Sequence, residues 1–385
     1  MIYLDYNATT PLCEPARAAM RPYFEEHFGN PSSVHAAGRE ARAAIDDARD
    51  QLASLLKATP HELIFTAGGT ESNNLAVLGL ARGQRERGRH LICGSTEHHA
   101  VLNAFEHLQK REGFDVTHLP VDSLGRIDPE DLAKAIQAET TLVSIMSANN
   151  ETGVVQPMPA IAAVCRERSV LLHGDMVQSF GKLPTDLSLV DAASFAAHKF
   201  YGPKGAGFLY LRAGLPIEPI QFGGAHENQR RPGTENVAAI AGMAAAAEWA
   251  LQDFEPEQKR QALLRDRLAR KIPAAKENGD TSNRLGNTLN VSFPGISSET
   301  ILMALDLEGV CASSGSACMV GSVVASHVLL AMGATPETAS SAIRFSLGKQ
   351  TTEAEIDAAA DAIARVIERL TRTKRRTRNE AYAVV

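Results

Sequence analysis

Cysteine is scarce in this 385-residue chain, and the few cysteines present are poorly placed for cross-linking or metal binding. They are scattered, odd in number and without a Cys-x-x-Cys pair: Cys13, Cys93, Cys165, Cys311 and Cys318. A disulfide framework and a metal site are therefore not expected. Such cysteine usage is typical of a reducing compartment, so we expect a cytoplasmic protein.

Long apolar runs and an excess of positive charge are missing as well. No stretch approaches the length of a membrane span, and residues 1–5 lack the basic and apolar regions of a signal peptide. The formal net charge is −6, and the one basic cluster, at 374–378, is interpreted as the solvated end of a helix. We therefore expect neither a membrane nor a nucleic acid as a partner.

The sequence does contain a regular alternation of short apolar runs and helical patterns. The apolar runs predict strands at 62–67, 90–95, 115–120, 141–147, 170–174, 192–196 and 206–212. An amphipathic helix is expected at 33–57, and others between strands at 70–82, 99–112, 128–138 and 158–168. This alternation predicts an α/β domain with a mostly parallel sheet of these seven strands. Ligands of such sheets bind near the carboxyl ends of the strands.

A second, smaller unit is predicted after an alanine-rich helix at 236–250. The stretch 251–257 looks like a helix break and restart, with Pro256 at the start of the next helix. Beyond it we expect helices at 256–271, 297–308 and 352–373, with strands near 287–293 and 342–347. The prediction is a large domain at 15–254 and a smaller α+β domain formed by 1–14 and 255–385.

Lys199 and Asp175 are the most informative candidates for chemistry. Lys199 follows a strand-like run and precedes the glycine-rich turn 201–205, while Asp175 ends another apolar run. A lysine in such a place can form a Schiff base, and a buried aspartate can keep a pyridine nitrogen protonated. These are the two groups that a pyridoxal 5'-phosphate (PLP) enzyme needs most. The alternatives are a surface lysine and an aspartate that caps a turn.

Three further motifs add weight to a PLP site. Gly69 and Thr70 join a strand to a helix, which suits a phosphate, although Thr70 also reads as a plain helix cap. His98 follows the strand 90–95, where it could stack on an aromatic cofactor and shuttle protons as a catalytic residue, or simply start a helix. Gln178, three residues after Asp175, could donate to the phenolic oxygen of a pyridine ring.

Cys318 stands apart from the other cysteines because of its surroundings. It lies in the stretch 313–322, whose small polar residues predict a mobile, accessible loop. Most cysteines are buried and inert, but a cysteine in such a loop is a candidate nucleophile. Cys311 lies in an apolar stretch and is interpreted as structural.

Taken together, these motifs resemble the cysteine desulfurases of the nitrogen-fixation and iron–sulfur-cluster type, which are class V aminotransferase-like PLP enzymes. The resemblance runs nearly the whole length of the chain, and so many motifs in one order are highly specific. They lie at residues 3–11, 29–35, 68–72, 97–98, 149–153, 175–178, 198–199, 231–236, 314–318 and 343–348.

The resemblance implies the PLP-dependent transferase fold type I and a homodimer. Lys199 would carry the cofactor, with Asp175 at the ring nitrogen and His98 stacked on the ring. The remaining roles that it implies are phosphate binding by Gly69, Thr70 and His198, with Thr234 reaching the phosphate of the neighbouring subunit, contacts of Asn150 and Gln178 with the ring oxygen, and substrate carboxylate binding by Arg344, assisted by Asn7 and Asn150.

The implied reaction removes sulfur from L-cysteine. Lys199 would take the α-proton, and Cys318 would attack the substrate sulfur to give L-alanine and a persulfide on Cys318. A sulfur-acceptor protein would then take the sulfur for iron–sulfur cluster or thio-cofactor synthesis. The alternatives are a selenocysteine lyase, another class V lyase or aminotransferase, and a non-catalytic interaction protein on the same fold.

Two departures from the family pattern are visible. The family usually has a serine three residues before the lysine, where its hydroxyl binds the phosphate, and Ala196 stands here instead. The missing hydrogen bond costs about 1–3 kcal/mol, so PLP is expected to be held less tightly unless a neighbour compensates. After Cys318 the residues 319–327 lack the usual proline and acid, so the sulfur acceptor is expected to differ from the usual scaffold protein.

Overall fold

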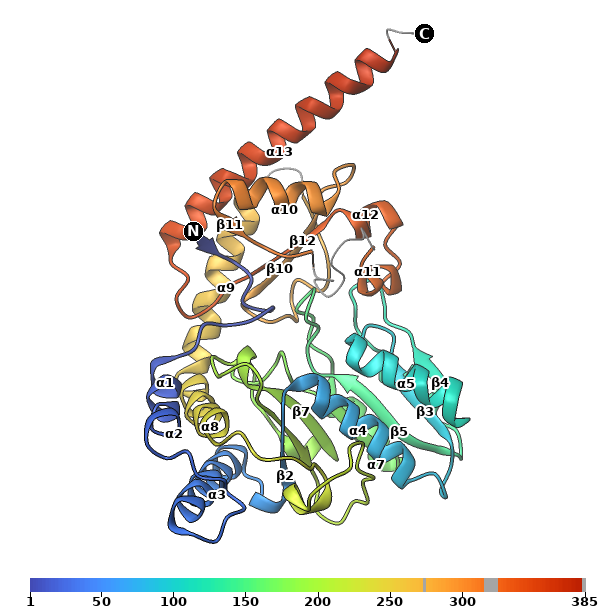
Figure 1. Ribbon diagram of the computed structural model, residues 1–385. Coiled ribbons are helices and arrows are strands. Elements are labelled where there is room, and N and C mark those ends of the chain that lie inside the picture. The colour runs from blue at the N-terminus through green and yellow to red at the C-terminus, as the bar shows by residue number, and fades with distance from the viewer. Residues whose placement is uncertain (273–274, 315–324, 383–385) are drawn as a thin grey trace.

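The large domain of the molecule is built on one seven-stranded sheet (Figure 1). The structure, a computed structural model, describes residues 1–272, 275–314 and 325–382. The strand order is β2-β8-β7-β6-β5-β3-β4, and only β8 runs antiparallel to its neighbours. The strands span Leu63–Thr66 (β2), His90–Gly94 (β3), Asp115–Leu119 (β4), Thr140–Met146 (β5), Leu171–Asp175 (β6), Ala192–Ala196 (β7) and Gly207–Leu211 (β8).

Both faces of this sheet are buried, because neighbouring strand residues point into two different cores. Ile64, Leu142 and Leu209 pack under helices α4 and α5, while Phe65 and Val143 pack in a core on the other face. The predicted mostly parallel sheet and all seven predicted strands are confirmed. The helices of this domain are Glu14–Met20 (α1), Pro22–Glu25 (α2), Ala36–Leu56 (α3), Gly69–Gly83 (α4), His99–Glu112 (α5), Pro129–Ala135 (α6), Met158–Glu167 (α7) and Val237–Leu251 (α8), with 3-10 turns at Pro60–Glu62, Leu187–Leu189, Ala197–Lys199 and His226–Gln229.

The small domain has its own apolar core around a three-stranded antiparallel sheet in the order β12-β10-β9. Its strands are Lys276–Glu277 (β9), Thr288–Ser292 (β10) and Ala342–Ser346 (β12), and β1 (Ile2–Tyr3) pairs in parallel with β11 (Val310–Cys311). Its helices are Phe254–Lys271 (α9), Ser298–Leu307 (α10), His327–Ala331 (α11), Pro336–Ser340 (α12) and Glu353–Tyr382 (α13).

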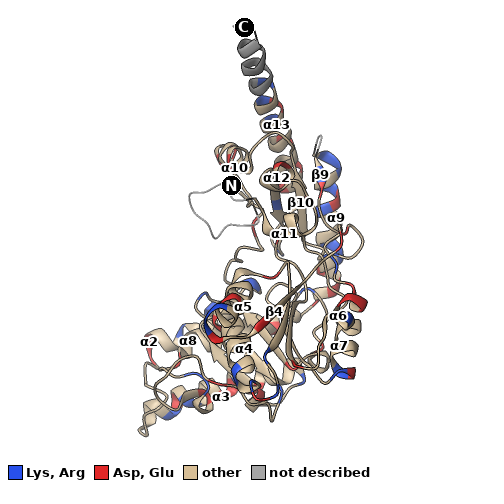
Figure 2. Ribbon diagram, turned by 90° about the vertical axis from the view of Figure 1, so that its right-hand side faces the viewer, with Lys and Arg blue, Asp and Glu red and all other residues tan. Residues whose placement is uncertain are grey.

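Helix α13 continues well past the predicted end at residue 373 and extends away from the rest of the molecule (Figure 2). Its first turns are held by apolar packing, since Ile356, Ile363 and Val366 are fully buried in the small-domain core. Across the described ranges, no helix is both long enough and apolar enough to cross a membrane.

Candidate active site

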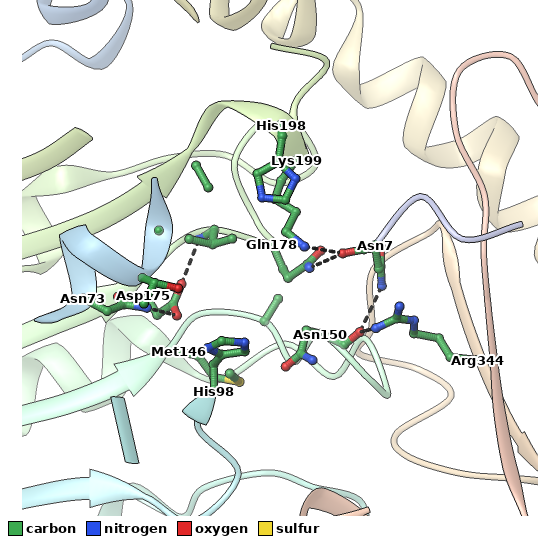
Figure 3. A pocket seen from close by; sticks show the side chains of 15 residues that line it. Asn7, Asn73, His98, Met146, Asn150, Asp175, Gln178, His198, Lys199 and Arg344 are labelled. Carbon is green, nitrogen blue, oxygen red and sulfur yellow. Dashed lines mark hydrogen bonds between the residues drawn. The ribbon is translucent and has the colours of Figure 1, made fainter. Parts of the chain in front are cut away.

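A cavity of about 240 Å³ opens at the edge of the large sheet where the parallel strands end. Met146, Asp175 and Ala196 are the last residues of three neighbouring strands, so the sheet itself places them side by side. Ten predicted site residues meet in this cavity (Figure 3), namely Asn7, Gly69, Thr70, His98, Asn150, Asp175, Gln178, His198, Lys199 and Arg344.

Asp175 presents a buried carboxylate that is held only by neutral donors. It is 5% exposed; its Oδ2 accepts from Asn73 Nδ2 at 2.7 Å and its Oδ1 accepts from the Val177 amide at 3.0 Å. In the described part of the chain, no lysine, arginine or histidine forms an ion pair with it. A buried charge needs a partner, and the protonated nitrogen of a pyridine ring in the cavity would supply one.

Lys199 enters the cavity from the 3-10 turn that follows β7. Its Nζ donates to the main-chain oxygens of Asn7 at 2.7 Å and Ala8 at 2.8 Å (Figure 3). These carbonyls belong to the N-terminal segment, which crosses from the small domain to the large one. The lysine and the Asp175 carboxylate line the same cavity.

The start of helix α4 forms a cradle for an anion. Gly68 has a φ of 148°, which L side chains rarely adopt. A Cβ on Gly69 would lie 2.8 Å from Val177 Cγ2 and 3.3 Å from Ala196 Cβ, so the backbone there must stay bare. Free N–H groups and the positive helix end favour a phosphate at this point. The residues present thus fit both the ring and the phosphate of PLP.

Two histidines flank this end of the cavity, and burial lowers the pKa of both. The pKa of His198 falls to about 4 through burial and the nearby Lys199 and Lys204 charges, and its Nδ1 lies 3.2 Å from Thr9 Oγ1. His98 caps helix α5, where its Nδ1 accepts from the Ala100 amide at 3.1 Å. Its pKa is also lowered, mainly by burial, so the ring is neutral at pH 7 and carries its proton on Nε2.

Arg344 is a buried guanidinium in the wall of the cavity. It lies in the middle of β12 and is 2% exposed. Nη1 donates to the Asn150 carbonyl at 2.9 Å and Nη2 to Asp5 Oδ1 at 2.8 Å, while the buried Nε has no partner among the described residues. A guanidinium in a cavity wall can bind a carboxylate in a bidentate pair.

Asn7 forms hydrogen bonds with residues of both domains beside the cavity. Its Nδ2 donates to Thr288 Oγ1 at 2.9 Å and to the Asn150 carbonyl at 3.2 Å, and its Oδ1 accepts from Asn287 at 2.9 Å. Both amide hydrogens are used inside the protein. The carbonyl oxygen of Asn7 rather than its side chain therefore faces Lys199 and Gln178.

Two of the predicted residues do not meet the others in this cavity. Thr234 lies exposed on the loop before α8, outside the lining residues. Cys318 falls at 315–324, outside the described residues. Ser313, five residues before it, pairs with Arg344 through two main-chain hydrogen bonds.

Four residues that line the cavity were not predicted from the sequence. Asn73, Met146, Ala148 and Val177 also line the cavity, and Asn73 holds Asp175 directly. Asn73 lies one helical turn after Gly69, so the 3.6-residue period could have placed it on the cavity face of α4. Asp5 belongs to a motif recognised at the N-terminus, but its pairing with Arg344 spans 339 residues and leaves no local signal.

Comparison with known proteins decides the family. A family model described as "Aminotransferase class-V" matches residues 2–359. The chain belongs to the class V aminotransferase family. A "Cysteine desulfurase IscS" from Dictyoglomus turgidum is 46% identical over 375 residues, which cover 96% of this chain and 95% of that relative.

Solved structures also resemble this class V enzyme along nearly its whole length. A "NifS-like protein" has a TM-score of 0.90 and 38% identity, covering 95% of this chain and 99% of its own. "SspA in complex with cysteine" has a TM-score of 0.81 and 35% identity, covering 90% and 99%. The predicted family, the PLP-dependent fold type I and the predicted PLP cofactor are confirmed.

Proposed function

We infer that this chain is a PLP-dependent cysteine desulfurase, a sulfurtransferase that converts L-cysteine to L-alanine. The observation that carries the inference is one cavity lined by Arg344, Lys199 and Asp175 together. The cavity thus offers Arg344 for the substrate carboxylate, Lys199 for the α-proton and Asp175 for the ring nitrogen of PLP. The curated relative from D. turgidum is a cysteine desulfurase along nearly the same length.

We assign the substrate-binding and proton-transfer roles to this chain's own atoms. Arg344 binds the substrate carboxylate through its guanidinium, next to Asn7 and Asn150. Bound PLP supplies an electron sink for negative charge at the α-carbon. Lys199 Nζ, once unprotonated, takes the α-proton, and neutral His98 offers its Nε2–H to the same space.

We propose that Cys318 receives the sulfur. Its thiolate attacks the substrate sulfur, a S–S bond forms, and the Cβ–S bond breaks with its electron pair left on Cβ. Cβ then takes a proton to become the methyl group of alanine, and Cys318 holds a persulfide. A sulfur-acceptor protein would collect this sulfur for iron–sulfur cluster or thio-cofactor synthesis.

The domain limits and the assembly are also proposed. We propose a large domain at 15–254 and a small domain formed by 1–14 and 255–385. Helix α9 begins at Phe254, in support of this boundary. We further propose a cytoplasmic homodimer in which Thr234 reaches the phosphate of the partner. Sedimentation at twice the mass of one chain would support the dimer, and a monomer at working concentration would refute it.

The exposed apolar side chains near the loop of Thr234 support the dimer. Phe28, Val34 and Phe222 are between 85% and 91% exposed, which is unusual for large apolar residues. Their segments meet where Ser32 Oγ lies 3.1 Å from His226 Nε2. A second copy of the chain would cover them.

The function is tested with L-cysteine and a reductant. The purified protein should release equimolar alanine and sulfide, and Lys199→Ala should abolish both. Cys318→Ser should retain the visible absorbance of the bound cofactor but lose at least 100-fold in sulfide release. The matched control, Cys311→Ser, lies in β11 away from the cavity and should keep the wild-type rate.

Mass spectrometry locates the sulfur. After cysteine treatment without reductant, the peptide with Cys318 should gain the mass of one sulfur atom. Wild-type sulfide release by Cys318→Ser would refute the persulfide role. A protein that makes no alanine from cysteine would refute the desulfurase itself.

A further inference from the structure

Lys182 is a second lysine beside the site, and no role described so far uses it. It follows Gly181, whose φ of 71° turns the chain after the 175–180 segment. Its Nζ donates to Gln178 Oε1 at 3.1 Å. Burial and the positive charges of Lys199 and Arg344 lower its pKa to about 7. Within the described ranges it takes part in no ion pair with a carboxylate.

The hydrogen bond from Lys182 decides how the Gln178 amide is turned. A lysine ammonium only donates, so the oxygen of the amide must face Lys182 and the NH₂ group must face the other way. Gln178 Nε2 donates to the Asn7 carbonyl at 2.9 Å, the same oxygen that accepts from Lys199 Nζ (Figure 3). Lys182, Gln178, Asn7 and Lys199 thus form one chain of hydrogen bonds.

Lys182 and Lys199 also line a second, smaller cavity between the two domains. Its volume of about 20 Å³ leaves room for about one water molecule. The other titratable groups that line it are Tyr6, Tyr201, Glu257 and Lys349. Glu257 is the only carboxylate among them, and it is paired with Arg260 at 2.7 Å. So small a cavity holds little water, so a charge on one lysine is weakly screened from the other.

We propose that Lys182 is a positioning residue of this site, which holds the Gln178 amide in one orientation and places a second positive charge beside Lys199. The inference rests on the proposed function, because it assigns Lys182 a purpose in that same site. While Lys182 holds its proton, up to a pH of about 7, the added charge favours loss of a proton from Lys199. The unprotonated amine is the form that bonds a carbonyl and takes the proton of the substrate.

The first test measures the proton affinity of Lys199 without relying on turnover. The apoenzyme is labelled with trace acetic anhydride at a series of pH values, and the peptide with Lys199 is quantified by mass spectrometry. In Lys182→Met the labelling of Lys199 below pH 7 should fall by on the order of tenfold, and the two proteins should converge at higher pH, where Lys182 is neutral. Lys182→Arg keeps the charge and the donor, so it should restore the wild-type labelling below pH 7.

Lys349 offers a matched control. It lines the same small cavity, but it binds the Trp249 carbonyl at 2.8 Å and lies over the Trp249 ring instead of contacting Gln178. Lys349→Met should therefore leave the labelling of Lys199 below pH 7 unchanged. Unchanged labelling in folded Lys182→Met, or an equal fall in Lys349→Met, would overturn the inference.

The second test separates this role from a merely structural one. In the holoenzyme, Lys182→Met should lower kcat about tenfold near pH 7, recover part of it at higher pH, and change KM for cysteine less than twofold. A loss that is independent of pH would overturn the inference. Alanine production by the wild-type enzyme is scored separately, so failure of the proposed function is distinguishable from failure of the Lys182 assignment.

Discussion

At the scale of single residues, Ala196 is the clearest departure from the family pattern inside the cavity. Its methyl group is buried at the end of β7 and lies beside Gly69, at the start of α4. A hydroxyl at this place would face the cradle for the phosphate. The cavity wall therefore carries a methyl group in place of one donor at the start of α4.

Restoring that hydroxyl should tighten cofactor binding. For Ala196→Ser we expect a five- to tenfold lower Kd for PLP, equivalent to about 1 kcal/mol for one added hydrogen bond. The measurement is titration of the apoenzyme followed by visible absorbance. Pyridoxal, which has no phosphate, is the control ligand and should bind both proteins equally. An equal gain for pyridoxal would show that the hydroxyl acts elsewhere.

The residues of the cavity differ in how far the sequence revealed them. Lys199, Asp175 and His98 each end or follow a strand-like run, and the carboxyl edge of a parallel sheet brings such positions together. Asn73 and Lys182 contact the side chains of Asp175 and Gln178 and belong to no recognised motif, so the sequence did not predict these contacts. Polar networks of this kind are set by three-dimensional packing and not by local pattern.

At the scale of elements, predictions from sequence periodicity hold for the strands and long helices but miss the short elements. Helix α5 spans the predicted 99–112, because its apolar positions repeat at the helical period between the His98 cap and Gly113, which has a φ of 71°. Helices α11 and α12 have five residues each, too few for a period to show. Strands β1 and β11 exist only because they pair with each other.

Helix α11 is fastened to the large domain at its first turn. Ser326 accepts from the Leu329 amide at 3.1 Å as the helix cap and donates to Glu151 Oε2 at 2.5 Å. His327 Nε2 lies 3.0 Å from the carbonyl oxygen of Glu97. Glu151 and Glu97 each neighbour a cavity residue in sequence, so this contact ties the helix to the walls of the site.

Removing the Ser326 hydroxyl should loosen that contact. Ser326→Ala deletes a helix cap and strips a buried carboxyl of its donor, with an expected loss of about 2–4 kcal/mol in the free energy of unfolding. Chemical denaturation measures it. Ser340→Ala in α12 loses only a hydroxyl bond to the Glu337 carbonyl in its own helix, and should cost less than about 0.5 kcal/mol. Equal losses would contradict the fastening role of Ser326.

At the scale of the whole molecule, stability must depend on pH through buried acids. Glu97 is 1% exposed; its Oε1 accepts from the Met146 amide at 2.6 Å, while Oε2 lacks a partner within the described residues. Burial, and then the Asp175 charge, raise the pKa of Glu97 well above its ordinary value of 4.5. Its stabilising contribution is therefore full below pH 4.5 and is lost as pH rises through the raised pKa.

Replacing this acid should flatten the pH profile of stability. Glu97→Gln keeps an oxygen for the Met146 amide but cannot ionise. We expect the variant to lose less stability than the wild type as pH rises from about 5 to 8. Thermal melts across that range measure the difference. Parallel profiles for the two proteins would show that Glu97 ionises as an ordinary acid.

The N-terminal segment contacts both domains, so the order in which the chain is synthesised affects when these contacts can form. β1 pairs with β11, Asp5 bridges to Ser346, and the Asn7 carbonyl holds Lys199. The first residues to leave the ribosome therefore cannot form these contacts until some of the last residues have been synthesised. Until residue 346 has emerged, the nascent chain has no finished pocket in which to capture its vitamin.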